Sequence, residues 1–336
     1  MTDALYRVEP TPWSSWRMAV LLGENSRTYK FALAHALLET AGEGRAEVRL
    51  SELAVPYALS LVEHLSTAPQ APGKSELGDQ DFLTVAGQEA DRTRESGRPT
   101  ERLLDVAGRS MRQMVLRKFP NLRGGGRLPH EFYRVTGGAD PTVELTAEML
   151  AIATSERAAG LRAELAARWN IVESSFTLEI GRGLLRDGLA VDLDSSALRD
   201  RYRRRPIAGL TDSVIGFQHG RCLICDEIIT PDTATAVDHV FPHALMRRYG
   251  SVAGWQGPDL DLLWNLAPAH HDCNSAKSDR LPTNAELRRL AERNDAILES
   301  PHPLRRTLEL NLVDAGFPGK TGQWARFLAK VQEAFR

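Results

Sequence analysis

The stretch of sequence that decides the fold contains four short motifs in order: Cys222-Leu-Ile-Cys225, Val237-Asp-His-Val-Phe-Pro242, Leu263-Trp-Asn-Leu-Ala-Pro268 and His270-His-Asp-Cys273-Asn-Ser-Ala-Lys277. All three cysteines of the chain lie here, and an odd number of cysteines makes a poor disulfide framework. No thioredoxin-like context accompanies the Cys-x-x-Cys pair, which disfavours a redox role. Together with the later His-x-x-Cys pair it supplies four ligands that tetrahedral zinc prefers. We therefore predict a structural zinc ion bound by Cys222, Cys225, His270 and Cys273, with His271 as an alternative to His270.

The same four motifs resemble the HNH endonuclease family. The order Cys-x-x-Cys, Asp-His-x-x-Pro, Asn-Leu and Cys-Asn-x-x-Lys is the basis of this resemblance, which covers Cys222 to Pro282, under a fifth of the chain. The chain departs from the family pattern at His270, where a cysteine is usual. The resemblance implies a ββα-metal finger and the hydrolysis of phosphodiester bonds.

Carried to matching positions, the resemblance implies a role for each polar residue. His239 would be the general base that activates water, since the pKa of an imidazole lies near neutrality. Asp238 and Asn274 would be oxygen ligands of a catalytic Mg²⁺ or Mn²⁺. Asn265 would bond the loop backbone and orient His239, and Lys277 would contact the substrate phosphate. Because neighbouring strand residues point to opposite faces, we expect a turn or bulge at Asp238 and His239.

Simpler roles are available for several of these residues. An isolated Asp-His pair would more often be a turn cap beside a buried histidine. Asn265 could lie in a plain turn, and Lys277 could be a solvated surface residue. His243 lies four positions after His239, but a polar surface role is favoured for it, and a structural role for His219.

The composition is that of an ordinary globular protein. The 336 residues are 42% hydrophobic and carry a formal net charge of −2, so any contact with nucleic acid must depend on local patches. No apolar run approaches the roughly 20 residues that span a bilayer, and no signal peptide is evident at the N-terminus. We expect a cytoplasmic location.

The helical periodicity predicts a mainly α fold with a small α+β module. Helical patterns cover 14–41, 142–176 and 195–204, and two closing helices are expected at 284–298 and 321–335. The predicted organisation is a mainly helical N-terminal domain for DNA or partner binding (1–185), a basic linker (186–206), the HNH nuclease module (207–283) and C-terminal helices (284–336).

Basic residues gather in two places. The segment 92–127 contains ten basic and three acidic residues. It is either a DNA-facing helix or a solvated helix balanced by the acidic segment before it. The second group lies in the predicted linker and comprises Arg201, Arg203, Arg204 and Arg205. We expect this group, together with Lys277, to contact DNA phosphates.

The predicted function is therefore that of a metal-dependent DNA endonuclease with a structural Zn²⁺ and a catalytic Mg²⁺ or Mn²⁺. Double-stranded DNA is the expected partner. The segments Tyr29-Lys-Phe-Ala-Leu-Ala and Glu164-Leu-Ala-Ala-Arg-Trp169 look like parts of bacterial HNH nucleases. That likeness suggests defence against foreign DNA, with partner subunits. The alternatives are a non-catalytic zinc-finger module that binds DNA or protein, and an RNA-directed nuclease.

Overall fold

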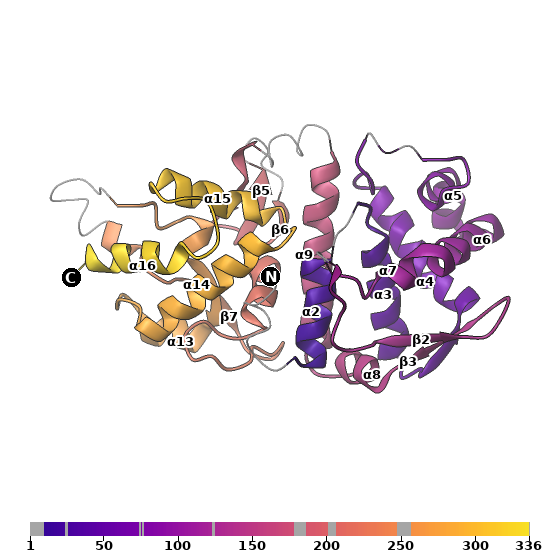
Figure 1. The fold of residues 1–336 in the computed structure, drawn as a ribbon, viewed down its shortest axis with the longest axis horizontal. Helices are drawn as coiled ribbons and strands as arrows, with labels where there is room; N and C mark the ends of the chain where they lie inside the picture. The colour runs from indigo at the N-terminus through magenta and orange to yellow at the C-terminus, as the bar shows by residue number, and fades with distance from the viewer. Residues whose placement is uncertain are drawn as a thin grey trace. The chain divides into compact units, whose positions relative to one another are not determined.

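The protein is described from a computed structural model. The described residues are 10–23, 26–73, 75, 77–122, 125–177, 186–200, 206–246 and 257–335. The chain divides into two compact units, one spanning Pro10–Gly181 and the other containing Arg182–Arg336 (Figure 1). The fold is mainly helical with small sheets of two or three strands, as predicted. Across the described part of the chain, every helix is too short or too polar to cross a membrane.

Helices form most of the first unit. Helix α3 is buried on nearly every side, because alanine and leucine fill half of its positions, and it packs against α4, α8 and α9. The helices and helical turns are α2 (Pro12–Leu22), α3 (Tyr29–Gly42), α4 (Leu50–Leu65), α5 (Phe82–Ser96), α6 (Glu101–Ser110), the π-helical η1 (Met111–Val115), α7 (Leu116–Lys118), α8 (Ala147–Ala153) and α9 (Ala158–Phe176).

Two long helices predicted in this unit are interrupted. The predicted helix 14–41 is two helices, α2 and α3. The predicted helix 142–176 begins instead with strand β3 (Thr142–Leu145), which lies between β1 (Glu47–Arg49) and β2 (Tyr133–Thr136) in an antiparallel sheet. The side chain of Thr146 then accepts a hydrogen bond from the Met149 backbone and starts α8.

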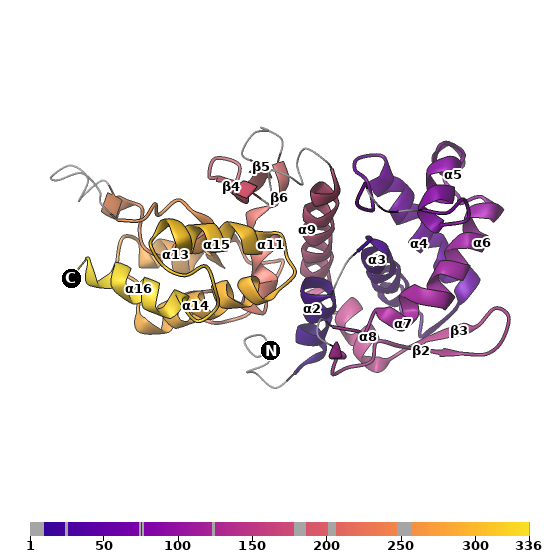
Figure 2. The ribbon, with the colours of Figure 1, turned by 45° about the horizontal axis from the view of Figure 1, so that its top comes forward.

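The second unit begins with a sheet where a linker and a helix were predicted. Strands β4 (Leu189–Asp192), β5 (Ala197–Asp200) and β6 (Pro206–Gly209) form it in that order, all antiparallel (Figure 2). The predicted helix 195–204 is therefore wrong over 195–200, and 201–204 lie outside the described residues. Arg199 on β5 pairs with Asp192 on β4 at 3.1 Å, so strand pairing overrides the helix propensity of alanine, leucine and arginine. Helix α11 (Leu210–Val214) and the 3₁₀ turn η3 (Ile215–Gln218) follow.

A two-stranded hairpin and a short helix carry the last three of the four sequence motifs. Strand β7 (Thr235–His239) pairs antiparallel with β8 (Leu266–His270), and the 3₁₀ turn η4 (Leu263–Asn265) leads into β8. Helix α13 (His271–Lys277) follows β8 directly and packs against β7. The order is therefore ββα.

Three helices close the chain where two were predicted. They are α14 (Asn284–Glu299), α15 (Leu304–Asp314) and α16 (Trp324–Glu333). Thr283 begins α14 through a capping box with Glu286. The buried Arg293 of α14 donates to the backbone carbonyls of Leu263 and Leu266, which fixes the start of β8.

Candidate metal centre and the polar end of the hairpin

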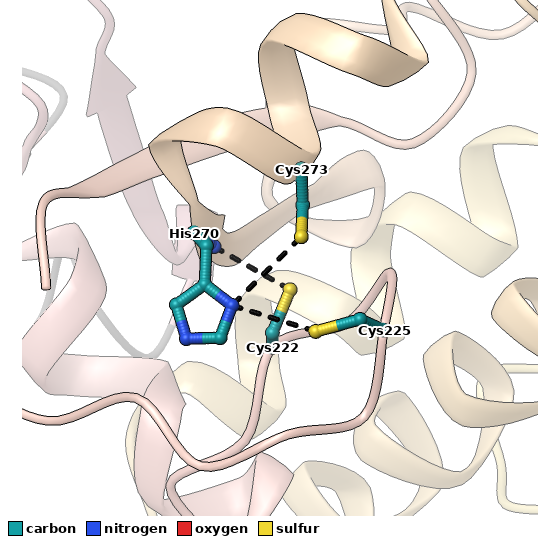
Figure 3. A group of neighbouring side chains, drawn as sticks. All are labelled: Cys222, Cys225, His270 and Cys273. Atoms are coloured by element: carbon teal, nitrogen blue, oxygen red, sulfur yellow. Dashed lines mark hydrogen bonds between the residues drawn. The ribbon is translucent and has the colours of Figure 1, made fainter.

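Four side chains gather at one end of the β7–β8 hairpin. Cys222 and Cys225 come from the turn after η3, His270 ends β8, and Cys273 lies in α13 (Figure 3). Their ligand atoms all lie within 4.8 Å of one another. Zinc–sulfur bonds of about 2.3 Å and zinc–nitrogen bonds of about 2.0 Å place tetrahedral ligands roughly 3.5–3.8 Å apart, so the group fits one ion. It could hold a metal such as zinc.

The histidine of this cluster is His270. Its Nδ1 faces the sulfurs, 3.4 Å from Cys225 and 3.8 Å from Cys273 (Figure 3). Its Nε2 lies 3.2 Å from the Ile228 carbonyl oxygen. A carbonyl only accepts, so Nε2 carries the proton and Nδ1 keeps its lone pair for a metal. The His271 side chain is 62% exposed and lies outside the group, which excludes it as the alternative ligand.

The electrostatics of the sulfurs also favour a cation. Burial, with the neighbouring sulfurs of Cys225 and Cys222, raises the pKa of the Cys273 thiol to about 12. Although partial burial opposes it, hydrogen bonds from the Glu227 backbone and from His270 lower the pKa of Cys225. Thiolates this close repel one another unless an ion lies between them, and a bound metal deprotonates them.

Asp238 and Lys277 form a buried ion pair at the other end of the hairpin. Lys277 Nζ lies 2.8 Å from Asp238 Oδ1 and donates to the His239 carbonyl oxygen at 2.8 Å, with side-chain exposures of 1% for Lys277 and 3% for Asp238. Lys277 is therefore not the solvated surface residue of the simpler interpretation. Its contact with a substrate phosphate stays a prediction. Burial raises the pKa of Asp238 against the opposing effect of Lys277. Asp238 Oδ2 is also buried and has no hydrogen-bond partner within the described chain.

His239 has a partner that the sequence analysis missed. Its Nε2 lies 3.0 Å from Oδ1 of Asp261, and Nε2 of His243 lies 3.5 Å from Oδ2 of the same carboxylate. Burial lowers the pKa of His239 against the opposing effect of Asp261. Asp261 lies four residues before Asn265, which was expected to orient His239. An acidic residue so close to Asn265 in the sequence was the signal that could have identified Asp261 as a partner of His239.

Asp238 and His239 lie in a regular strand. The register pairs Asp238 with Ala267 and His239 with Leu266 without a shift, so the bulge expected between the two residues is absent. Their side chains accordingly have different partners, Lys277 for Asp238 and Asp261 for His239.

Asn265 fixes the loop that follows His239. Its side-chain amide donates to the carbonyls of Phe241 and Leu260, and its Oδ1 accepts from the Phe241 backbone at 2.8 Å. Its own carbonyl accepts from the Val240 backbone at 2.9 Å. The residue is fully buried. Asn265 thus bonds the loop backbone as expected.

The remaining predicted residues are less constrained. Asn274 lies half-buried on α13, and no hydrogen bond joins its side chain to Asp238 within the described chain. Arg201, Arg203, Arg204 and Arg205, which were predicted to contact DNA, lie outside the described residues. In the segment 92–127, Arg94 pairs with Asp91 at 2.8 Å, so part of the basic charge is neutralised locally.

Comparisons with protein-family models, with curated proteins and with solved structures found no match to this chain.

Proposed function

We propose that this chain is a metal-dependent endonuclease that hydrolyses DNA phosphodiester bonds, with His239 as the general base. The observation that carries the proposal is the setting of His239. Its Nε2 is bonded to Asp261, while no group of the described chain bonds its Nδ1, and the side chain is 24% exposed. A half-buried imidazole with one free nitrogen can take a proton from water that approaches from solvent.

The charge state of His239 supports the same role. Burial lowers the pKa of His239, which favours the neutral ring that a general base needs. A neutral ring with its proton on Nε2 has its lone pair on Nδ1, and Nδ1 can then accept a proton from water.

Two oxygen atoms are suited to a hard cation. The buried Oδ2 of Asp238 lacks a partner among the residues described, and Asn274 follows on the helix that packs against β7. These residues would hold Mg²⁺ or Mn²⁺. When bound, the ion would stabilise negative charge on the phosphate and on the departing oxygen.

Plasmid cleavage tests the proposal. The purified chain is incubated with supercoiled DNA in Mg²⁺, in Mn²⁺ and in EDTA, beside His239→Ala and the control His35→Ala. His35 is a half-exposed histidine of the first unit that pairs with Glu39. We expect cutting by the wild-type chain and by His35→Ala, dependent on added metal, and none by His239→Ala. Cutting by His239→Ala at the wild-type rate would disprove the assignment.

A non-catalytic zinc-containing module that binds DNA or protein is the second candidate, and one observation favours it. The ammonium group of Lys277 already neutralises Asp238, which weakens the attraction of that carboxylate for a divalent cation. DNA binding without cutting in any metal would support this candidate, and cutting of structured RNA instead of plasmid would identify an RNA nuclease. A role in defence, with partner subunits, rests on the sequence resemblance alone.

A further inference from the structure

Asp261 lies in the loop before η4 and contacts the residue proposed as the base. The geometry points to Asp261 as the positioning residue of His239, holding the imidazole by Nε2 so that Nδ1 faces the reacting water. This inference rests on the proposed function, because it concerns the same imidazole. It adds a residue that neither the motifs nor the resemblance identified.

The first step is the direction of the hydrogen bond. Asp261 Oδ1 and His239 Nε2 are 3.0 Å apart, and an ionised carboxylate only accepts. The proton of the neutral ring therefore lies on Nε2. The same logic operates wherever a carboxylate fixes the tautomer and the orientation of a catalytic histidine.

The second step is that the loop holds Asp261 firmly. The Asp261 backbone donates to Oδ1 of Asp259 at 2.9 Å, and the Trp264 indole donates to the Asp259 carbonyl at 3.0 Å. The neighbouring Leu260 is fully buried, and its carbonyl accepts from Asn265. A carboxylate held on a constrained loop orients its partner without a large entropic cost.

The third step concerns the second oxygen of the same carboxylate. Oδ2 faces Nε2 of His243 at 3.5 Å, and the rings of His243 and His239 are 5.8 Å apart. Each oxygen therefore faces one imidazole. Replacing Asp261 by asparagine leaves a single acceptor oxygen for two rings, so the substitution disturbs His239 while it preserves the shape of the side chain.

A double-mutant cycle separates positioning from a structural role. Asp261→Asn should lower kcat about 10²-fold with KM unchanged, the scale expected when a reacting group is displaced by about 1 Å. In the His239→Ala background, measured at high enzyme concentration to resolve the residual rate, Asp261→Asn should cause no further loss. Asp232→Asn is the matched control, since it removes the same charge from an exposed aspartate of the same unit. A further loss in the His239→Ala background, or an unchanged kcat for Asp261→Asn, overturns the inference.

An NMR measurement tests the contact independently of activity. A hydrogen-bonded Nε2 proton of His239, assigned by its disappearance in His239→Gln, should give a slowly exchanging signal in the wild-type chain. This signal should be lost in Asp261→Ala and kept in Asp232→Asn. Its persistence in Asp261→Ala overturns the inference even if the chain cuts DNA. If the wild-type chain cuts no DNA, the proposed function fails, and the signal still decides whether Asp261 holds His239.

Discussion

The two ends of the β7–β8 hairpin differ in how the charges of their side chains are balanced. At the end where Thr235 pairs with His270, three sulfurs and one imidazole converge, and no lysine or arginine of the described chain pairs with them. At the end where His239 pairs with Leu266, the acids have basic partners: Asp238 has Lys277, and Asp261 has His239.

This difference separates stability from chemistry. We expect the sulfur end to need an external cation to hold its ligands together, so that its folding depends on the metal. The polar end is neutralised by the chain itself and can form without any ion. Substitutions at the two ends should therefore fail in different ways.

The largest effect is expected from breaking the sulfur end. Cys222→Ser or His270→Ala removes one ligand of a site of the kind that contributes about 10–16 kcal/mol in zinc-finger peptides, so the metal content should fall from about one ion per chain towards zero. The melting temperature of the second unit should drop with it. Metal analysis and calorimetry measure both.

The matched control is His271→Ala, because His271 is adjacent in sequence but lies outside the cluster. It should keep the metal. Retention of metal by His270→Ala, or its loss from His271→Ala, would show that the wrong histidine has been assigned.

The next effect is at the polar end and should leave stability untouched. His239→Ala should lower the cleavage rate about 10²- to 10⁴-fold, the usual contribution of a general base, with unchanged metal content and melting temperature. Cleavage kinetics with metal analysis on the same sample provide the comparison. Loss of the metal in this variant would mean that the two ends are not independent.

The sequence predicted the sulfur end better than the polar end, for a physical reason. Ligands of one ion come in closely spaced pairs, so the spacing of Cys222 and Cys225, and of His270 and Cys273, was sufficient. The partner of His239 comes from a loop 22 residues away, and only the folded chain brings Asp261 to it. The burial of Lys277 was missed for a related reason. A lysine on a short helix is usually solvated, and only packing of α13 on β7 shows that it neutralises Asp238.

The mainly helical fold could be predicted because helices leave a periodic pattern of apolar residues in the sequence. The boundaries of its elements could not be predicted in the same way. Residues 195–204 show the limit. Their composition favours a helix, but pairing with β4 makes Ala197–Asp200 a strand. Tertiary pairing of this kind leaves no periodic signal in so short a segment.

Breaking the buried ion pair should cost stability without affecting the metal cluster. Lys277→Met leaves the Asp238 carboxylate buried without its partner, which costs about 3–5 kcal/mol. Adding Asp238→Asn should recover much of this loss, because the unpaired charge is then removed. Urea unfolding of the second unit, followed by tryptophan fluorescence, compares the three proteins. If Lys277→Met alone were as stable as the wild-type chain, the ion pair would contribute nothing to the stability of the second unit.

The ion pair between Arg280 and Glu286, at the start of α14, should make the stability of the second unit sensitive to acid. Burial would raise the pKa of Glu286, but Arg280 and the Thr283 backbone outweigh it, so the pKa is lowered. A lowered pKa means that this stabilisation is present above the unfolded value, about 4.3, and is lost as the pH falls through the folded value.

Glu286→Gln should therefore lower the melting temperature at pH 7 by a few degrees, consistent with about 1–2 kcal/mol for a charge-assisted cap. The difference from the wild-type chain should shrink as the pH falls below about 4. Equal differences at both pH values would mean that the charge of Glu286 is unimportant.

The smallest effect concerns the affinity for DNA. Neither end of the hairpin has surplus positive charge with which to attract DNA phosphates. In the first unit, Arg117 and Lys118 are exposed at the end of α7 and form no ion pair with any described residue. If they contact DNA phosphates, each lost contact should reduce the slope of log affinity against log salt by about 0.9.

The variants Arg117→Gln and Lys118→Gln are compared with Arg94→Gln, because the guanidinium of Arg94 is already paired with Asp91. Binding to a non-cleaved duplex in EDTA, measured by fluorescence anisotropy across a salt series, gives the slopes. Equal slopes for all variants would remove this face from the interface, and a change confined to Arg117 and Lys118 would show that DNA affinity resides in a different unit from both ends of the hairpin.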